Sequence, residues 1–527
     1  MWKKTKDSSS QNQKVSKNEK ALFENKTIIE LRDFQDSCSS LSQKEVFERI
    51  GVLDKKYSND LNYWSNIDGT IANIGHIKND SDIISYSIKR INLKLNEKKV
   101  TNQMKNKFYY DLGVSITDKE DIKLGYPPTI KSLLNTDAYR EASRFYFKIS
   151  NSNKAYPSAM TNLSNILEKY SRNYEAILLY DKVLETHPNF GMALGNKALA
   201  IVYYYKLTRK NPELLLTAID LLEKAILQKN TKQAGGPNIL NFMQSELDNL
   251  KSHINQNIIK ETLESKKKVT SLSDELQFYK KNKLFINLCF GCELCEQGFR
   301  DDLIPKYVIN AQEIDFDEFQ KFNGFPKSIF FSFKMLNQIF EDFSMARKLI
   351  WLYKNDNFKD TDNLTNYIYT LDYVTNSIKY GYIKTSFSKL YNILDKIAYL
   401  IFYYFDAERD SIYFSDIHCN EIKENIIKTN NNHFLALYSL SNDFNEGGMY
   451  NNLRLLRNKI IHRFLNFSNS CESNFEIKEN DFYNETIRLF GVVKASLVYF
   501  INAVDFEGKK YDEKITQQKS IYFQKDF

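Results

Sequence analysis

Apolar residues recur every three or four positions over most of this chain, which is the spacing of amphipathic helices. Between residues 27 and 123, for example, Ile84, Ile88 and Ile91 follow one another at this spacing. In the C-terminal half the pattern runs along five stripes, which cover residues 335–353, 364–378, 385–405, 447–466 and 481–505. Long helices without an alternating strand pattern predict a helical bundle. Residues 406–432 lie between two stripes, are polar, and predict an inserted loop.

An internal repeat lies in the part of the chain between residues 125 and 245. In three segments a small residue is followed four positions later by a large one: Ala142 and Tyr146, Ala176 and Tyr180, Ala218 and Leu222. The small residue lets two helices approach closely, and the large one fills the groove to the next pair. The pattern resembles a short array of tetratricopeptide (TPR) repeats, although the tryptophan and glycine of that motif are missing. A generic stack of helical hairpins is the alternative.

The composition agrees with an all-α fold. The 527 residues include only 17 glycines and 8 prolines, well below the roughly 12% that these residues usually contribute. Folds built from short strands need such turn residues about every 8 to 12 positions. We therefore predict a TPR-like α-solenoid followed by a helical bundle. The predicted parts are a disordered basic tail over residues 1–24, a helical region over 25–124, TPR-like repeats over 125–245, a helical linker over 246–283 and the bundle over 284–527.

The net charge and the lengths of the apolar segments indicate which partners and which cellular location to expect. A formal charge of +7 permits a nucleic-acid partner without requiring one. No apolar stretch follows the basic N-terminus, so we expect no secretory signal. The most apolar segments, 397–405 and 489–504, are shorter than the roughly 20 residues of a spanning helix. We expect no membrane anchor and a cytoplasmic location.

Six cysteines in so long a chain do not indicate a disulfide framework, which agrees with a reducing compartment. Three of them, Cys289, Cys292 and Cys295, are spaced closely enough to bind zinc. Helical spacing also places two of these thiols on an apolar face, and free cysteine is among the most buried residue types. We favour the structural interpretation, and we expect neither a metal nor a cofactor.

One basic helical segment, residues 453–464, carries the candidate chemistry. Motifs for a phosphate-binding loop, a dinucleotide fold, a zinc protease and a serine hydrolase are absent from the chain. The segment contains no acidic residue and four basic ones, Arg454, Arg457, Lys459 and Arg463. At 100° per residue, one face is an apolar stripe predicted to pack in the core, formed by Leu453, Leu456, Ile460 and Phe464.

His462 lies on the opposite face of this predicted helix from the apolar stripe. Leu455, Asn458 and Leu465 lie beside it, so the outer face also carries apolar side chains. This arrangement predicts that the outer face is covered, and a second subunit is the natural cover.

Arg457 and His462 resemble the R-x(4–6)-H signature of the HEPN superfamily, whose helical bundles include many metal-independent ribonucleases. TPR-like repeats ahead of such a bundle are similar to a TPR-plus-HEPN group of prokaryotic proteins. The resemblance implies a composite site formed by two motifs at a subunit interface. Histidine titrates near neutral pH and can transfer the proton of a ribose 2′-OH. Arginine offers a planar, charged fork to phosphate oxygens.

The same resemblance assigns expected roles to the neighbouring residues. Asn458 would orient the phosphate or the histidine, and Asp395 would support the motif from the preceding long helix. Arg454, Lys459 and Arg463 would hold the RNA backbone electrostatically. A variant motif, R-x4-H-x-Y, is associated with nucleotidyltransferases that modify its tyrosine, but this chain has Phe464 there. We therefore disfavour that form of regulation.

We predict a metal-independent endoribonuclease that cleaves tRNA or mRNA as a homodimer or a higher even oligomer. The resemblance implies a role as a toxin or in defence against phage, with a trigger or protein partner bound by the TPR-like repeats. The alternative is a non-catalytic scaffold or RNA-binding protein. No role is predicted for residues 27–123.

Overall fold

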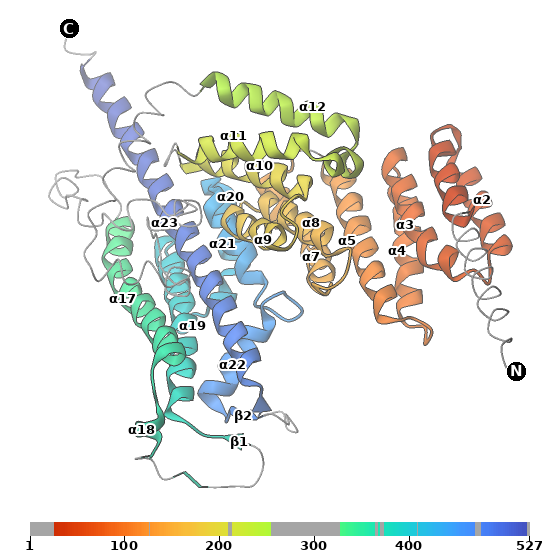
Figure 1. The fold of residues 1–527 in the computed structure, drawn as a ribbon. Helices are drawn as coiled ribbons and strands as arrows, with labels where there is room; N and C mark the ends of the chain where they lie inside the picture. Colours follow the sequence, from red (N-terminus) through yellow and green to blue (C-terminus); the bar gives the residue numbers. More distant parts are fainter. Residues whose placement is uncertain are drawn as a thin grey trace, which may run out of the picture. The chain divides into compact units, whose positions relative to one another are not determined.

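The computed structural model describes residues 26–125, 127–208, 213–253, 327–363, 367–368, 374–407, 409–468 and 476–523. These residues form helices almost throughout, which confirms the predicted all-α class (Figure 1). The chain divides into two compact units, Met1–Leu163 and Ser164–Phe527. The predicted disordered tail, the cysteines at 289, 292 and 295, and residues 254–283 of the predicted linker lie outside the described residues.

The described part of the first unit is a succession of helices, as the sequence predicts for residues 25–124. Polar caps mark where several of them begin, because the side chains of Ser42, Asp60 and Thr101 accept N–H groups of the first turn. The elements are a helix over residues 26–37, η1 (Cys38–Ser40), α2 (Gln43–Lys56), α3 (Leu61–Lys78), α4 (Ser81–Leu95), α5 (Asn102–Leu124), α6 (Ile130–Leu134), α7 (Ala138–Phe147) and the beginning of α8 (Tyr156–Lys169).

The second unit begins with the later part of α8 and the remaining repeat helices. These are α9 (Asn173–Thr186), α10 (Gly191–Thr208), α11 (Glu213–Leu227) and α12 (Lys229–His253). The helix α10 packs against both α9 and α11. All six small and large residues of the repeat are buried, on α7, α9 and α11, as helix stacking requires. The assignment to the TPR family stays a prediction.

The bundle is built around α19 (Ile378–Tyr404), which packs against α17 (Lys327–Asn355), α22 (Asn451–His462) and α23 (Glu479–Phe523). These neighbours surround α19, so its buried residues lie on several sides of the helix. Most of them are apolar residues that recur three and four positions apart. The other helices in the described part of the bundle are α18 (Lys359–Asn363), η3 (Phe414–Ile417), α20 (Asn420–Thr429) and α21 (Asn432–Asn442).

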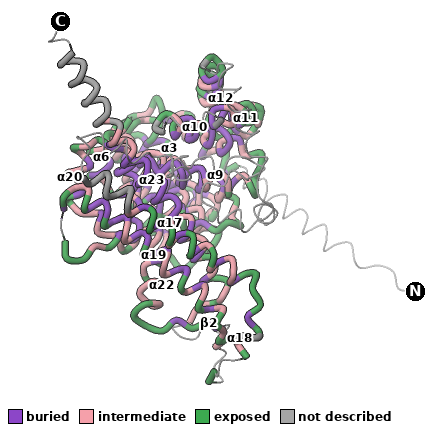
Figure 2. The backbone as a smooth tube through the Cα atoms, turned by 90° about the vertical axis from the view of Figure 1, so that its left-hand side faces the viewer, coloured by how far each residue is buried: buried purple, intermediate pink, exposed green. Residues whose placement is uncertain are grey.

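Among the described helices, residues 479–508 of α23 are long and apolar enough to cross a membrane. This segment packs against α17, α19 and α21, and 83% of its most apolar window is buried within the protein. Figure 2 shows the burial along α23. The apolar composition of α23 is therefore explained by its place in the bundle core.

Two sequence predictions about the bundle are wrong. The predicted helix over 364–378 contains the strand β1 (Val374–Thr375), which pairs antiparallel with β2 (Asn466–Ser468); β2 pairs parallel with β3 (Glu476–Ile477). Pairing with a segment about ninety residues away cannot be read from local periodicity. The predicted loop over 406–432 contains η3 and α20. In α20, Ile422 and Ile426 lie one helical turn apart and are both buried, so apolar packing holds this helix within a polar segment.

Candidate active site

Residues 453–462 of the basic segment lie in α22, whose inner face packs on α19. Leu453 and Leu456 are buried, as predicted, whereas Phe464 is 78% exposed. The prediction for Phe464 is wrong because α22 ends at His462 and the next residue, Arg463, is extended (φ −143°, ψ −165°). The helical periodicity therefore stops before residue 464. For the same reason Leu465, predicted on the outer face, is buried instead.

Arg457 is held against the domain surface by two aromatic rings and a carboxylate. Its Cζ lies 5.5 Å and 5.6 Å from the ring centroids of Tyr391 and Tyr413, within the range of cation–π attraction. Its Nη2 lies 3.7 Å from Oδ2 of Asp395, and its Nη1 donates to Oδ1 of Asn458 at 3.3 Å. The guanidinium therefore has a defined orientation, with the side chain 16% exposed.

Asp395 supports this arrangement from α19. Its Oδ1 accepts the backbone N–H of Phe414 at 2.9 Å, so the segment predicted to be a loop contributes to the site. Burial raises the pKa of Asp395 to about 6, although the Phe414 N–H and the Arg457 charge act in the opposite direction. The carboxylate consequently changes its charge, and its attraction for Arg457, in the mildly acidic range.

The raised pKa of Asp395 predicts a specific pH dependence of stability. The folded protein retains a proton on this carboxyl between its ordinary pKa of 3.8 and about 6, where the unfolded chain has released it. The free energy of unfolding therefore falls as the pH rises through this window, and the whole cost is present above pH 6. Replacing Asp395 by Asn removes this cost, so Asp395→Asn should stabilise the protein more at pH 7.5 than at pH 4.5.

The expected difference between the two pH values is on the order of 2 kcal/mol, measured by urea unfolding of both proteins. Glu424→Gln is the matched control, because it removes an exposed carboxyl of α20 that does not contact Arg457. An equal effect of Asp395→Asn at both pH values would contradict the assignment.

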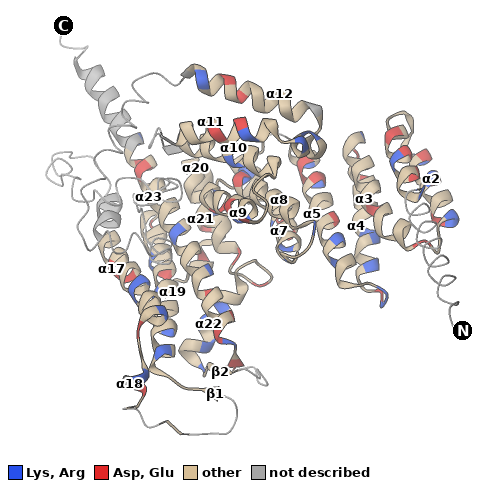
Figure 3. Ribbon diagram, viewed as in Figure 1, with Lys and Arg blue, Asp and Glu red and all other residues tan. Residues whose placement is uncertain are grey.

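The other candidate residues of the motif differ in their exposure to solvent. His462 and Arg463 are exposed, and within the described chain the side chain of His462 forms no hydrogen bond or ion pair. Arg454 donates from Nε and Nη2 to Oδ1 of Asn451, and Lys459 is half-buried. Figure 3 shows the Lys and Arg positions of α22. The structure thus brings Arg457, Asn458 and Asp395 together, and it leaves His462 apart from them.

The separation of Arg457 and His462 follows from helix geometry. Both residues belong to α22, and positions five apart on a helix diverge by about 140°. The side chains of one chain therefore point in different directions.

Besides the backbone N–H of Phe414, three side chains of this region were not predicted from the sequence. Tyr391 could have been found, because it lies one turn before Asp395 on the same helix face. Tyr413 and Lys384 carry no such pattern. Lys384 donates from Nζ to the carbonyl of Leu465 and thereby ties the chain after α22 to α19. Burial lowers the pKa of Lys384, whose side chain also lies over the ring of Phe467.

A buried charged cluster holds the beginning of α22. Arg172, just before α9, donates to both carboxylate oxygens of Glu175 at 2.7 and 2.8 Å and to Asp443 at 2.6 Å. Tyr450, the residue directly before α22, donates to Oε1 of Glu175 at 2.9 Å. Tyr499 of α23 donates to the other oxygen at 3.2 Å. A repeat helix and the motif helix are therefore joined through one carboxylate.

The protonation of this cluster agrees with its geometry. Burial raises the pKa of Tyr450 far above its usual value, and the neighbouring Glu175 charge raises it further. The phenol therefore stays protonated and remains a hydrogen-bond donor. Arg172 is fully buried, so its two carboxylate partners replace the water that it has lost.

Within the described residues, no group of three or more His, Cys, Asp and Glu side chains is arranged to hold a metal ion. Residues 326–507 match the family model described as LA2681-like HEPN. This span contains α19, α22 and every residue of the site. The curated proteins and the solved structures contain no match to the chain.

Proposed function

We propose that this protein, whose residues 326–507 are an LA2681-like HEPN domain, is a metal-independent endoribonuclease. One observation carries the proposal. Arg457 is fixed beside Asp395, between Tyr391 and Tyr413, while His462 of the same helix is presented to solvent. An oriented cation and an exposed histidine are the two groups that RNA cleavage without a metal needs.

In the proposed reaction His462 accepts the proton of the ribose 2′-OH as its oxygen attacks the adjacent phosphorus. The bond from phosphorus to the 5′-oxygen breaks, and a protonated histidine returns a proton to that oxygen. Arg457 stabilises the negative charge of the phosphorane. The products are a 2′,3′-cyclic phosphate and a 5′-hydroxyl, and the cyclic ester can open to a 3′-phosphate.

The neighbouring residues have supporting roles in this proposal. Asn458 and Asp395 are positioning residues, because both bond to or face the Arg457 guanidinium. The basic side chains of Arg454, Lys459 and Arg463 hold the RNA backbone. We propose tRNA or mRNA in the cytoplasm as the substrate, cleaved in a toxin or phage-defence role.

We propose that the complete site is formed by two copies of the chain, since Arg457 and His462 of one copy diverge. Leu455 lies seven residues before His462 and so on the same face of α22, and its side chain is 47% exposed. An apolar residue beside a catalytic histidine supports a contact with a second subunit.

Leu455→Glu should therefore convert a dimer to a monomer and abolish cleavage, although Arg457 and His462 are intact. Sedimentation velocity and the cleavage rate measure the two effects. Leu227→Glu is the matched control, because Leu227 is exposed at the end of α11 and away from the motif. A Leu455→Glu dimer with unchanged activity would contradict the composite site.

We further propose that the repeat helices regulate the nuclease. The contact of Glu175 with Tyr450 supports this, because a partner that moves α9 would act directly on the residue before α22. In this proposal a trigger binds the repeat helices and moves α9. The hydrogen bond between Glu175 and Tyr450 then passes the movement to the beginning of α22.

The test of the proposed function is cleavage of tRNA and total RNA by the purified full-length protein in EDTA, with analysis of the product ends. We expect cleavage that leaves 5′-hydroxyl ends and that disappears in Arg457→Ala/His462→Ala. Products with 5′-phosphate ends would contradict the mechanism. RNA binding without cleavage, equal in both proteins, would favour the alternative of a non-catalytic scaffold.

A further inference from the structure

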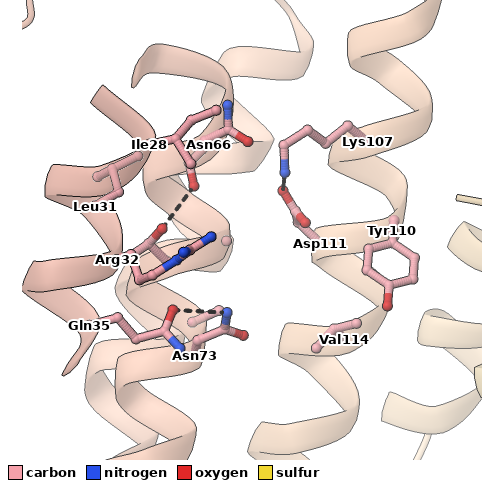
Figure 4. A pocket seen from close by; sticks show the side chains of 13 residues that line it. Ile28, Leu31, Arg32, Gln35, Asn66, Asn73, Lys107, Tyr110, Asp111 and Val114 are labelled. Carbon is pink, nitrogen blue, oxygen red and sulfur yellow. Dashed lines mark hydrogen bonds and ion pairs between the residues drawn. The ribbon is translucent and has the colours of Figure 1, made fainter. Parts of the chain in front are cut away.

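A pocket of about 470 Å³ lies in the first unit between the helix over residues 26–37, α3 and α5 (Figure 4). Its volume falls within the range of small-molecule sites, roughly 300 to 1,000 Å³. The small residues Gly69 and Ala72 of α3 line the pocket. A Cβ at Gly69 would lie 3.2 Å from the carboxylate of Asp111. The glycine therefore lets the Asp111 side chain approach α3 closely at the wall of the pocket.

The walls of the pocket carry charges of both signs. Lys107 of α5 donates to Oδ2 of Asp111 at 2.9 Å, and Asp111 is 7% exposed. Arg32 extends into the space from the opposite wall (Figure 4), and it forms no ion pair within the described chain. Two cations face one carboxylate, so the lining has an excess positive charge. This excess favours an anionic ligand.

The lower end of the pocket in Figure 4 presents a hydrogen-bonding edge. Asn73 donates from Nδ2 to Oε1 of Gln35 at 3.4 Å. This leaves Nε2 of Gln35 and Oδ1 of Asn73 as a neighbouring donor and acceptor. Amide groups in such a pair match the donor and acceptor edge of a nucleobase. Val114 lies toward this lower end, and Ile28 and Leu31 supply apolar surface toward the upper end of the pocket (Figure 4).

We propose that this pocket binds a nucleotide. Arg32 binds the phosphate, because, of the two cations that line the pocket, it is the one without an ion pair in the described part of the chain. Asp111, neutralised by Lys107, accepts a hydrogen bond from a ribose hydroxyl. Gln35 and Asn73 contact the edge of the base. The inference concerns the first unit only and does not depend on the proposed nuclease activity.

The experiment is isothermal titration of the full-length protein with AMP, GMP, CMP and UMP, and with ribose 5-phosphate and inorganic phosphate. We expect at least one nucleoside monophosphate to bind at least tenfold more tightly than ribose 5-phosphate. Arg32→Gln should weaken that binding at least tenfold, and Gln35→Leu should reduce the difference between the bases. Arg32 and Gln35 are not in the core, so both variants should fold.

Lys44→Gln is the matched control, because it removes one positive charge from an exposed position of α2 outside the pocket. Equal affinity for the nucleotides, ribose 5-phosphate and phosphate would overturn the proposal, since the pocket would recognise only an anion. Failure of all four nucleotides to bind at millimolar concentration would also overturn it, as would binding that Arg32→Gln leaves unchanged. None of these results depends on RNA cleavage.

Discussion

His462→Ala is expected to lower the rate of RNA cleavage by about 10²- to 10⁴-fold, which is the usual contribution of a general acid–base group. The free energy of unfolding should stay the same, because His462 is exposed at the end of α22 and its removal leaves no cavity. Single-turnover cleavage rates and urea unfolding measure the two quantities. A loss of activity without a loss of stability identifies a chemical role.

The control for this experiment is His76→Ala, which removes another exposed histidine, on α3 of the first unit. Arg457→Lys complements it, since lysine retains the charge but lacks the planar fork that faces Asp395. We expect Arg457→Lys to be strongly impaired as well. Cleavage by His462→Ala at the wild-type rate, with the same product ends, would refute the proposed mechanism.

Arg172→Met is expected to destabilise the protein by about 3 to 5 kcal/mol, because it leaves the carboxylates of Glu175 and Asp443 buried without their cation. Methionine fills a similar space, so the expected loss comes from unpaired charge. Urea unfolding at pH 7.5 measures it.

The matched control is Lys224→Met, which breaks the exposed pair of Lys224 with Asp220. Exposed pairs contribute about 0 to 1 kcal/mol, so this variant should unfold almost like the wild type. Similar unfolding free energies for the two variants would show that the cluster around Arg172 does not hold the repeat helices to the bundle.

The fold class and the motif helix were accessible from the sequence because both depend on local periodicity. Leu453 and Leu456 were predicted in the core and are buried. Phe464 was misplaced because the end of α22 is not set by periodicity: the chain turns extended at Arg463 and continues into β2. The contribution of Phe414 to the site was not predicted, because the polar composition of residues 406–432 indicated a loop. Residues 414–417 of this segment form η3 instead.

By itself, the sequence determined that the chain is helical, that the repeat residues are buried, and that Arg457 and His462 share one helix. These properties depend on residues within a few turns of one another, where helix geometry relates position to direction. Only the tertiary structure decided what surrounds them. The contacts of Arg457 with Asp395 and Tyr391, and of Arg172 with Asp443, join residues 62 to 271 positions apart. Such pairs are brought together by the packing of whole helices, which no local pattern records.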